Sequence, residues 1–198
     1  MKISDLRVGV ARIATGAIAL LLAAHCTAQT ALSFDAMTER LEACIACHGK
    51  EGRTINAEYL PRIAGKPAGY LYNQLVNFRD GRRNNAVMSH LLQPLSDAYL
   101  REIAQYFSAL DLPYPPPQTP KGSADALRLG ETLVLRGDPS RKLPSCSQCH
   151  GTPMTGVTPA IPGLLGLPSA YLSAQLGAWR AGQRRAHAPD CMGEMAKS

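Results

Sequence analysis

Cys44-Ile45-Ala46-Cys47-His48 is one of two stretches with the pattern Cys-x-x-Cys-His; the other is Cys146-Ser147-Gln148-Cys149-His150, and a glycine follows each. In this pattern both thiols can add to the vinyl groups of a haem, while the histidine binds its iron. One copy alone is also compatible with a zinc site or a redox-active dithiol, but two copies favour haem. The sequence therefore predicts two covalently bound haem c groups. The attachment residues are Cys44, Cys47, Cys146 and Cys149, and the iron ligands are His48 and His150.

The N-terminus has the pattern of a secretory signal. A basic start precedes an apolar run from Ile13 to Ala24, and small residues lead from there to Ala28. A run of about twelve residues is too short to cross a bilayer, which needs roughly 20. We predict a signal peptide over residues 1–28 and a periplasmic protein that is soluble after cleavage. The alternative is a lipoprotein acylated at Cys26, but a small residue is wanted before such a cysteine and His25 stands there.

The chain also contains an internal repeat. Residues 61–83 match the residues 101 positions later, in the segment 162–184, through a shared Pro/Gly loop, a Tyr-Leu-x-x-Gln-Leu segment and spaced arginines. This pattern indicates a tandem duplication of one domain. We predict domain 1 over residues 29–112 and domain 2 over residues 123–198. The proline-rich residues 113–122 form an extended linker between them.

Apolar residues recur at helical spacing in both halves. Residues 100–110 show this period behind Ser96, a favourable N-cap. Residues 70–78 show it again in the first repeat, as do residues 170–179 in the second. No long alternating pattern predicts a strand. We therefore expect an all-α fold in which each small domain depends on its haem for much of its core.

A methionine thioether is the expected second ligand of each iron. Met88 lies between two predicted helices of the first domain, and Met192 lies three residues after Pro189, the position that aligns with Met88 in the second. A thioether favours ferrous iron and raises the potential, which suits electron transfer. Met37 is interpreted as a core residue. The competing ligands are His90 in the first domain, and Met195, His187 and Met154 in the second.

These features together resemble the cytochrome c4 family, dihaem proteins made of two fused class I cytochrome c domains. The resemblance extends from about Phe34 to Lys197 and rests on both haem motifs, Pro61-Arg62-Ile63-Ala64-Gly65, the repeated Tyr-Leu-x-x-Gln-Leu, Arg79-x-Gly81-x-Arg83 and Met88. It implies two tandem class I cytochrome c-like domains with His/Met ligation of both irons. It also implies that the carbonyls of Pro61 and Pro162 accept hydrogen bonds from the ligand histidines, which strengthens the iron ligands.

The implied function is a periplasmic electron carrier between a membrane quinol-oxidising complex and a terminal oxidase, not an enzyme. The alternative is the electron-accepting subunit of a dehydrogenase, such as a flavocytochrome sulfide dehydrogenase. A dihaem peroxidase ranks last, because peroxide reduction needs an iron site that opens. The expected partners are membrane-bound or soluble redox proteins, and peripheral membrane association stays open. Basic residues in the second half could steer an acidic redox partner, but a solvated surface with no single role is the favoured interpretation. Nucleic acid is not expected.

Two features have no counterpart in the first half. Cys191 is left over after the haem motifs, and we interpret it as a small, partly buried side chain and not as a redox-active thiol. The sequence stops at Ser198, soon after Met192, so we expect domain 2 to lack the C-terminal helix that closes domain 1.

Overall fold

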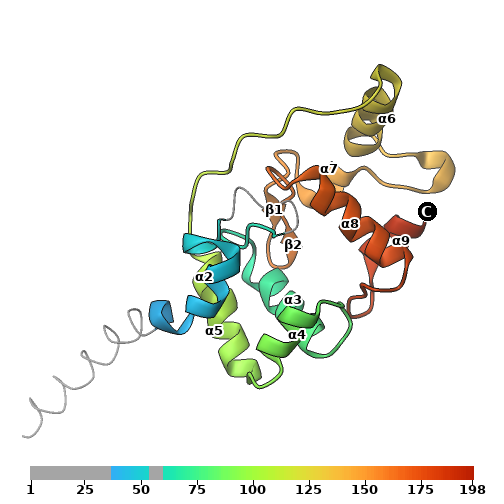
Figure 1. Cartoon of the computed structure of the whole chain (residues 1–198). Helices are drawn as coiled ribbons and strands as arrows, with labels where there is room; N and C mark the ends of the chain where they lie inside the picture. Colours follow the sequence, from blue (N-terminus) through green and yellow to red (C-terminus); the bar gives the residue numbers. More distant parts are fainter. Residues whose placement is uncertain (1–36, 54–59) are drawn as a thin grey trace, which may run out of the picture. The chain divides into compact units, whose positions relative to one another are not determined.

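The computed structural model describes residues 37–53 and 60–198 (Figure 1). The predicted signal peptide lies outside the described residues. The described chain divides into two units after Ala43. Of the first unit, residues 37–40 are helical, and Met37 is buried as expected. The part of the chain that is described contains no helix long and apolar enough to cross a membrane.

The structure is mostly helical with little strand, as predicted. The helices are α2 (Glu42–His48), α3 (Ala68–Arg79), α4 (Ala86–Leu92), α5 (Asp97–Ser108), α6 (Ala124–Leu135), α7 (Cys146–His150), α8 (Ser169–Arg180) and α9 (Cys191–Lys197), with 3-10 turns at Lys50–Gly52 and Pro139–Arg141. A short antiparallel hairpin joins β1 (Gly156–Val157) to β2 (Ile161–Pro162). Strands of two residues are too short to produce an alternating sequence pattern.

In the first repeat, α3 packs against both α4 and α5. The N-cap predicted at Ser96 is present, because its hydroxyl accepts a hydrogen bond from Tyr99 N at 3.3 Å. The apolar face of α5 is buried and consists of Leu100, Ile103, Ala104 and Phe107.

In the second repeat, α8 packs against α9, and α6 packs against α7. Helix α6 also has a serine N-cap, since Ser123 Oγ accepts from Ala126 N at 3.2 Å. Unlike α5, it leaves large apolar side chains in solvent, with Leu127 at 40%, Leu129 at 60% and Leu135 at 53% exposure.

The repeats share one loop geometry and differ in how it is packed. Gly52 O accepts from Ile63 N at 2.8 Å, and Met154 O accepts from Leu164 N at 2.7 Å. Both acceptor residues have left-handed backbones, with φ 69° at Gly52 and 57° at Met154. A Cβ on Gly52 would lie 2.6 Å from Ile63 and 2.9 Å from Phe107. The first repeat therefore requires glycine here, because α5 packs directly on the backbone.

The proline-rich segment has neither helix nor strand between residues 110 and 121 and runs as an extended strap from α5 to α6 (Figure 1). It is attached along its length. Arg62 donates to the carbonyls of Leu112 and Pro113, both at 2.6 Å. Tyr114 Oη donates to Thr155 O at 3.2 Å. The strap therefore has fixed contacts with both repeats. The exact domain boundaries stay a prediction.

Candidate haem-binding sites

Helix α2 brings Cys44, Cys47 and His48 together on one short element. His48 is buried, and its Nδ1 lies 3.0 Å from the carbonyl of Pro61. A carbonyl can only accept, so Nδ1 carries the proton and Nε2 is left as an electron-pair donor. Burial lowers the pKa of His48 and so favours the neutral ring that a metal needs.

Helix α7 repeats this arrangement with Cys146, Cys149 and His150. Ser145 starts the helix by accepting from Gln148 N at 3.2 Å. His150 is buried, and its Nδ1 lies 2.8 Å from the carbonyl of Pro162 on β2. The hairpin thus fixes the orientation of the ring, and both proline–histidine hydrogen bonds implied by the resemblance are present.

None of the cysteines that the structure describes forms a disulfide, and Cys191 is exposed and not partly buried as expected. In each motif the first cysteine is half-buried and the second is exposed. Burial raises the pKa of Cys44 and of Cys146. Reactive cysteines generally have lowered pKa values, so nothing in these two sites favours a redox-active dithiol.

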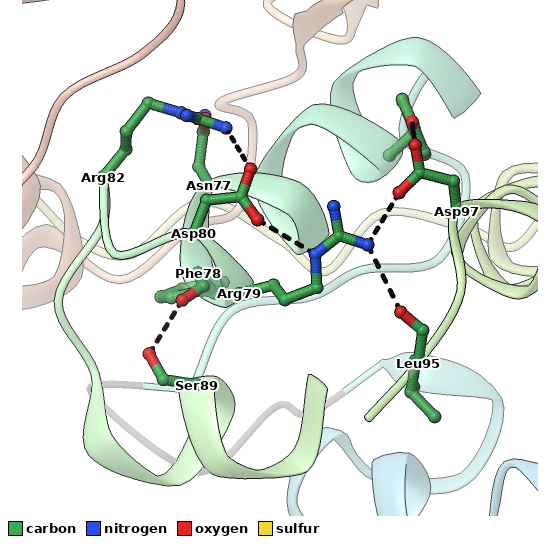
Figure 2. A network of polar contacts seen from close by, with 9 residues as sticks. Asn77, Phe78, Arg79, Asp80, Arg82, Ser89, Leu95 and Asp97 are labelled. Carbon is green, nitrogen blue, oxygen red and sulfur yellow. Dashed lines mark hydrogen bonds and ion pairs between the residues drawn. The ribbon is translucent and has the colours of Figure 1, made fainter. Parts of the chain in front are cut away.

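Met88 lies in the first turn of α4. Asn85 caps this helix by accepting from Met88 N at 3.0 Å. Ser89 Oγ donates to Phe78 O at 2.8 Å and so attaches α4 to α3 (Figure 2). Met88 is half-buried, whereas the competing ligand His90 is exposed.

A polar network holds the segment that carries Met88 (Figure 2). Arg79 pairs with Asp80 at 2.9 Å and with Asp97 at 2.6 Å, and it also donates to Leu95 O at 3.2 Å. The bonds from Arg79 lower the pKa of both carboxyl groups. The network joins the end of α3 to the start of α5. The second repeat has Ala181 in place of Asp80, so it lacks this support.

Met192 is the second residue of α9. Asp190 caps this helix by accepting from Gly193 N at 3.0 Å. Met192 is half-buried. Of its rivals, His187 is exposed, whereas Met195 and Met154 are half-buried. Burial therefore disfavours the histidine but does not separate the methionines.

Two buried arginines occupy equivalent positions in the repeats and were not predicted as site residues. Arg83 and Arg184 are only 8% and 6% exposed. None of the ion pairs recorded among the described residues involves either guanidinium. Desolvation, with a further contribution from Arg83, lowers the pKa of Arg184. Buried, like-charged groups of this kind favour a bound anion.

Trp179 adds an unsatisfied donor beside them. Within the described part of the chain, its Nε1 is the buried side-chain nitrogen or oxygen atom that has no hydrogen-bond partner. The Arg184 guanidinium lies 3.8 Å from the centre of the indole ring. The equivalent first-repeat pair, Arg83 over Phe78, has a separation of 4.4 Å. Unpaired cations and an unpaired N–H fit the carboxylates that a haem carries. The spacing of the arginines was visible in the sequence, but the burial of their side chains was not.

Two Cys-x-x-Cys-His helices, each with a buried imidazole oriented by a proline carbonyl, define a c-type cytochrome that binds two haems covalently. Cytochrome c4 of Pseudomonas aeruginosa is 33% identical over 172 residues, which cover 84% of this chain and 82% of that protein. The chain belongs to the cytochrome c4 family. It is an electron-transfer protein and not an enzyme.

Other relatives are named by a more specific role. A protein of Thiomonas intermedia called thiosulfate dehydrogenase electron acceptor is 44% identical over 77% of this chain and 69% of its own length. A protein of the same name from Stutzerimonas stutzeri is 38% identical over 79% of this chain and 71% of its own length. A search of family models finds no match.

Solved structures agree with this assignment. Reduced cytochrome c4 from Pseudomonas stutzeri is 30% identical, with a TM-score of 0.69 over 82% of this chain and 88% of that one. A thiosulfate dehydrogenase structure from Marichromatium purpuratum is 35% identical, with a TM-score of 0.67 over 77% of this chain. The match spans only 32% of that longer chain. The predicted fold of two class I cytochrome c domains is confirmed.

Proposed function

We propose that this protein accepts electrons from a thiosulfate dehydrogenase in the periplasm and passes them to another redox protein. The observation that carries the proposal is the ranking of relatives. Identity is 44% and 38% to two thiosulfate dehydrogenase electron acceptors, against 33% to cytochrome c4 of P. aeruginosa. This favours the dehydrogenase-linked alternative over transfer from a quinol-oxidising complex to a terminal oxidase. The sequence alone did not separate these roles.

The proposal assigns the residues as follows. Cys44, Cys47, Cys146 and Cys149 form the thioether bonds; His48 and His150 are the proximal ligands, and Met88 and Met192 are the distal ligands. When bound, each haem supplies an iron that changes between ferric and ferrous states and so carries one electron. The chain's own part is to hold the imidazole rings through Pro61 and Pro162.

Three buried hydrogen-bond donors also have a role in this proposal. Arg83, Arg184 and Trp179 would hold haem propionates, because they are buried without an acidic partner among the described residues. The remaining acceptors around the arginines are neutral. Arg83 Nη1 donates to Gln74 at 2.8 Å, and Arg184 Nη1 donates to Gln175 at 2.7 Å. Neutral partners leave the positive charge uncompensated.

The test is a stopped-flow measurement of haem reduction. The oxidised protein, shown by intact mass to carry two haems, is mixed with thiosulfate and a thiosulfate dehydrogenase. We expect fast reduction only when enzyme and thiosulfate are both present. A monohaem cytochrome c of similar potential serves as the control acceptor. Reduction no faster than that of the control, together with faster reduction by a quinol-oxidising complex, would support the other carrier role.

A further inference from the structure

Lys66 is a buried cation that reaches from the first repeat into the second. It follows the loop that carries Pro61, yet its Nζ donates to the carbonyl of Gly163 at 2.7 Å. The side chain is only 3% exposed. Ion pairs recorded among the described residues do not include it. A lysine buried against a single carbonyl is costly, so a structural role alone does not explain a charged residue here.

The acceptor of this bond is next to the residue that orients the second haem ligand. Gly163 directly follows Pro162, whose carbonyl lies 2.8 Å from His150 Nδ1. Gly163 also has no room for a side chain, because a Cβ there would lie 2.4 Å from Thr155 O. Because Gly163 has no side chain, the ammonium group of Lys66 reaches the backbone next to Pro162, which orients His150.

The two repeats are not equivalent at this point. The residue that aligns with Lys66 in the second repeat is Leu167, which is half-buried. The second repeat thus receives a buried charge from the first and returns none at the matching position. Any effect of this charge should fall mainly on one of the two haems.

We propose that Lys66 is a positioning residue that tunes the second haem from across the domain boundary, by holding the Pro162–Gly163 backbone and by placing a positive charge close to it. The proposal rests on the assignment of His150 as the ligand. A nearby cation disfavours ferric iron, which has one more positive charge than ferrous iron, and so raises the potential. The effect is large only for a charge shielded from water.

Protonation of this lysine gives the proposal a pH signature. Burial, reinforced by the charge of Arg62, lowers the pKa of Lys66 to about 8. Arg62 is the charged group whose repulsion lowers the pKa of Lys66, and its own guanidinium donates to the carbonyls of Leu112 and Pro113 in the strap. As the pH rises through this value the cation is lost and the potential of the second haem falls. Near this pH, reduction of the second haem by one electron from the redox partner raises the pKa of the amine and is accompanied by partial uptake of a proton from water.

The experiment measures both midpoint potentials from pH 6 to 10 by titration followed by paramagnetic NMR, where the haem methyl signals of the two haems are separate. Haem content by intact mass is determined first, so that loss of a haem is distinguished from a changed potential. In the wild type we expect the second potential to fall between pH 7 and 9. Lys66→Met and Lys66→Gln should lower it at pH 6, with a several-fold change in the ferric-to-ferrous ratio at fixed potential, and abolish the step. The first haem should change little.

Lys66→Arg supplies the decisive contrast. An arginine stays charged across this range, so the potential should remain high without the step. Lys142→Met, which removes an exposed lysine of the second repeat, is the control and should change neither haem. The proposal is overturned if Lys66→Gln matches the wild type, because only the hydrogen bond would then matter. It is also overturned if two haems are present and Lys66→Met leaves the second potential and its pH dependence unchanged.

Discussion

Arg83 and Arg184, at equivalent positions of the two repeats, pair with each other through their backbones in an isolated antiparallel bridge. Their side chains share two acceptors. Arg83 donates to Gln74 and Gln175, both at 2.8 Å, and Arg184 donates to Gln175 at 2.7 Å and to Gln74 at 3.0 Å. Each guanidinium therefore bonds to its own repeat and to the other. The duplicated sequence has become a nearly symmetric polar contact between the repeats.

Replacing one arginine of this contact should weaken the protein. Arg184→Met removes donors from both glutamines and leaves buried acceptors short of a partner, which costs about 1–3 kcal/mol. Urea unfolding measures the loss. Arg185→Met is the control, because Arg185 is exposed and uses its backbone N–H, which donates to Arg82 O at 2.7 Å. Equal stability of the two variants would contradict a structural role for the shared glutamines.

Trp179→Phe tests whether the buried indole N–H has a haem carboxylate as its partner. The first repeat already has Phe78 at this position. If a carboxylate accepts the bond, the variant should lose about 1.5–3 kcal/mol of stability in the haem-loaded protein. The midpoint potential of the second haem should also be lower, because the carboxylate loses a hydrogen-bond donor. A neutral or stabilising effect in urea unfolding would show that the nitrogen has no partner in the loaded protein.

Met192→Ala should remove the distal ligand of the second haem. The weak near-infrared absorption of oxidised His/Met haem should then fall by the share of one haem, and carbon monoxide should bind the reduced protein. Met195→Ala and His187→Ala should leave both properties unchanged. If either of these variants removes the band and Met192→Ala does not, the ligand assignment is wrong.

Gly52→Ala should destabilise the first repeat by more than its backbone conformation explains. A left-handed residue other than glycine costs roughly 1–2 kcal/mol, and overpacking against Ile63 and Phe107 adds about 1–3 kcal/mol. Gly81→Ala is the matched control, since Gly81 has a φ of 72° and a Cβ there would meet nothing within 4 Å. Thermal unfolding of the two variants separates the cost of the backbone conformation from the cost of overpacking. Equal losses would exclude a packing contribution from α5.

Stability should also depend on the pH through Lys66. The pKa falls from the ordinary 10.5 to about 8 on folding, so the unfolded chain binds more protons between these values. Stability therefore rises with pH across this window, and the full cost of the buried charge is present below it. At about 1.4 kcal/mol per pKa unit, the wild type should gain a few kcal/mol relative to Lys66→Met. Parallel pH profiles in urea unfolding would contradict this.

The haem motifs, the duplication and most helices were predictable from the sequence because they depend on short-range chemistry. Two thiols and an imidazole within five residues suit one haem edge, and Ser96 caps its helix through a bond to Tyr99, three residues later. The proline–histidine bonds were implied only by the family resemblance. Identification of Met192 stays a prediction, because burial does not distinguish it from Met195.

What only the tertiary structure decided are the contacts between residues about a hundred positions apart. Lys66 and Gly163 are 97 residues apart, and Arg83 and Gln175 are 92 residues apart. Charged side chains are almost never buried without a partner, so the burial of Lys66 could not be predicted from the sequence. The contacts of Lys66 and of both arginines with the opposite repeat arise only when the two repeats pack together. The repeats share one sequence pattern, but their packing brings Lys66 of the first repeat against the histidine-binding loop of the second, where the residue aligned with it is Leu167.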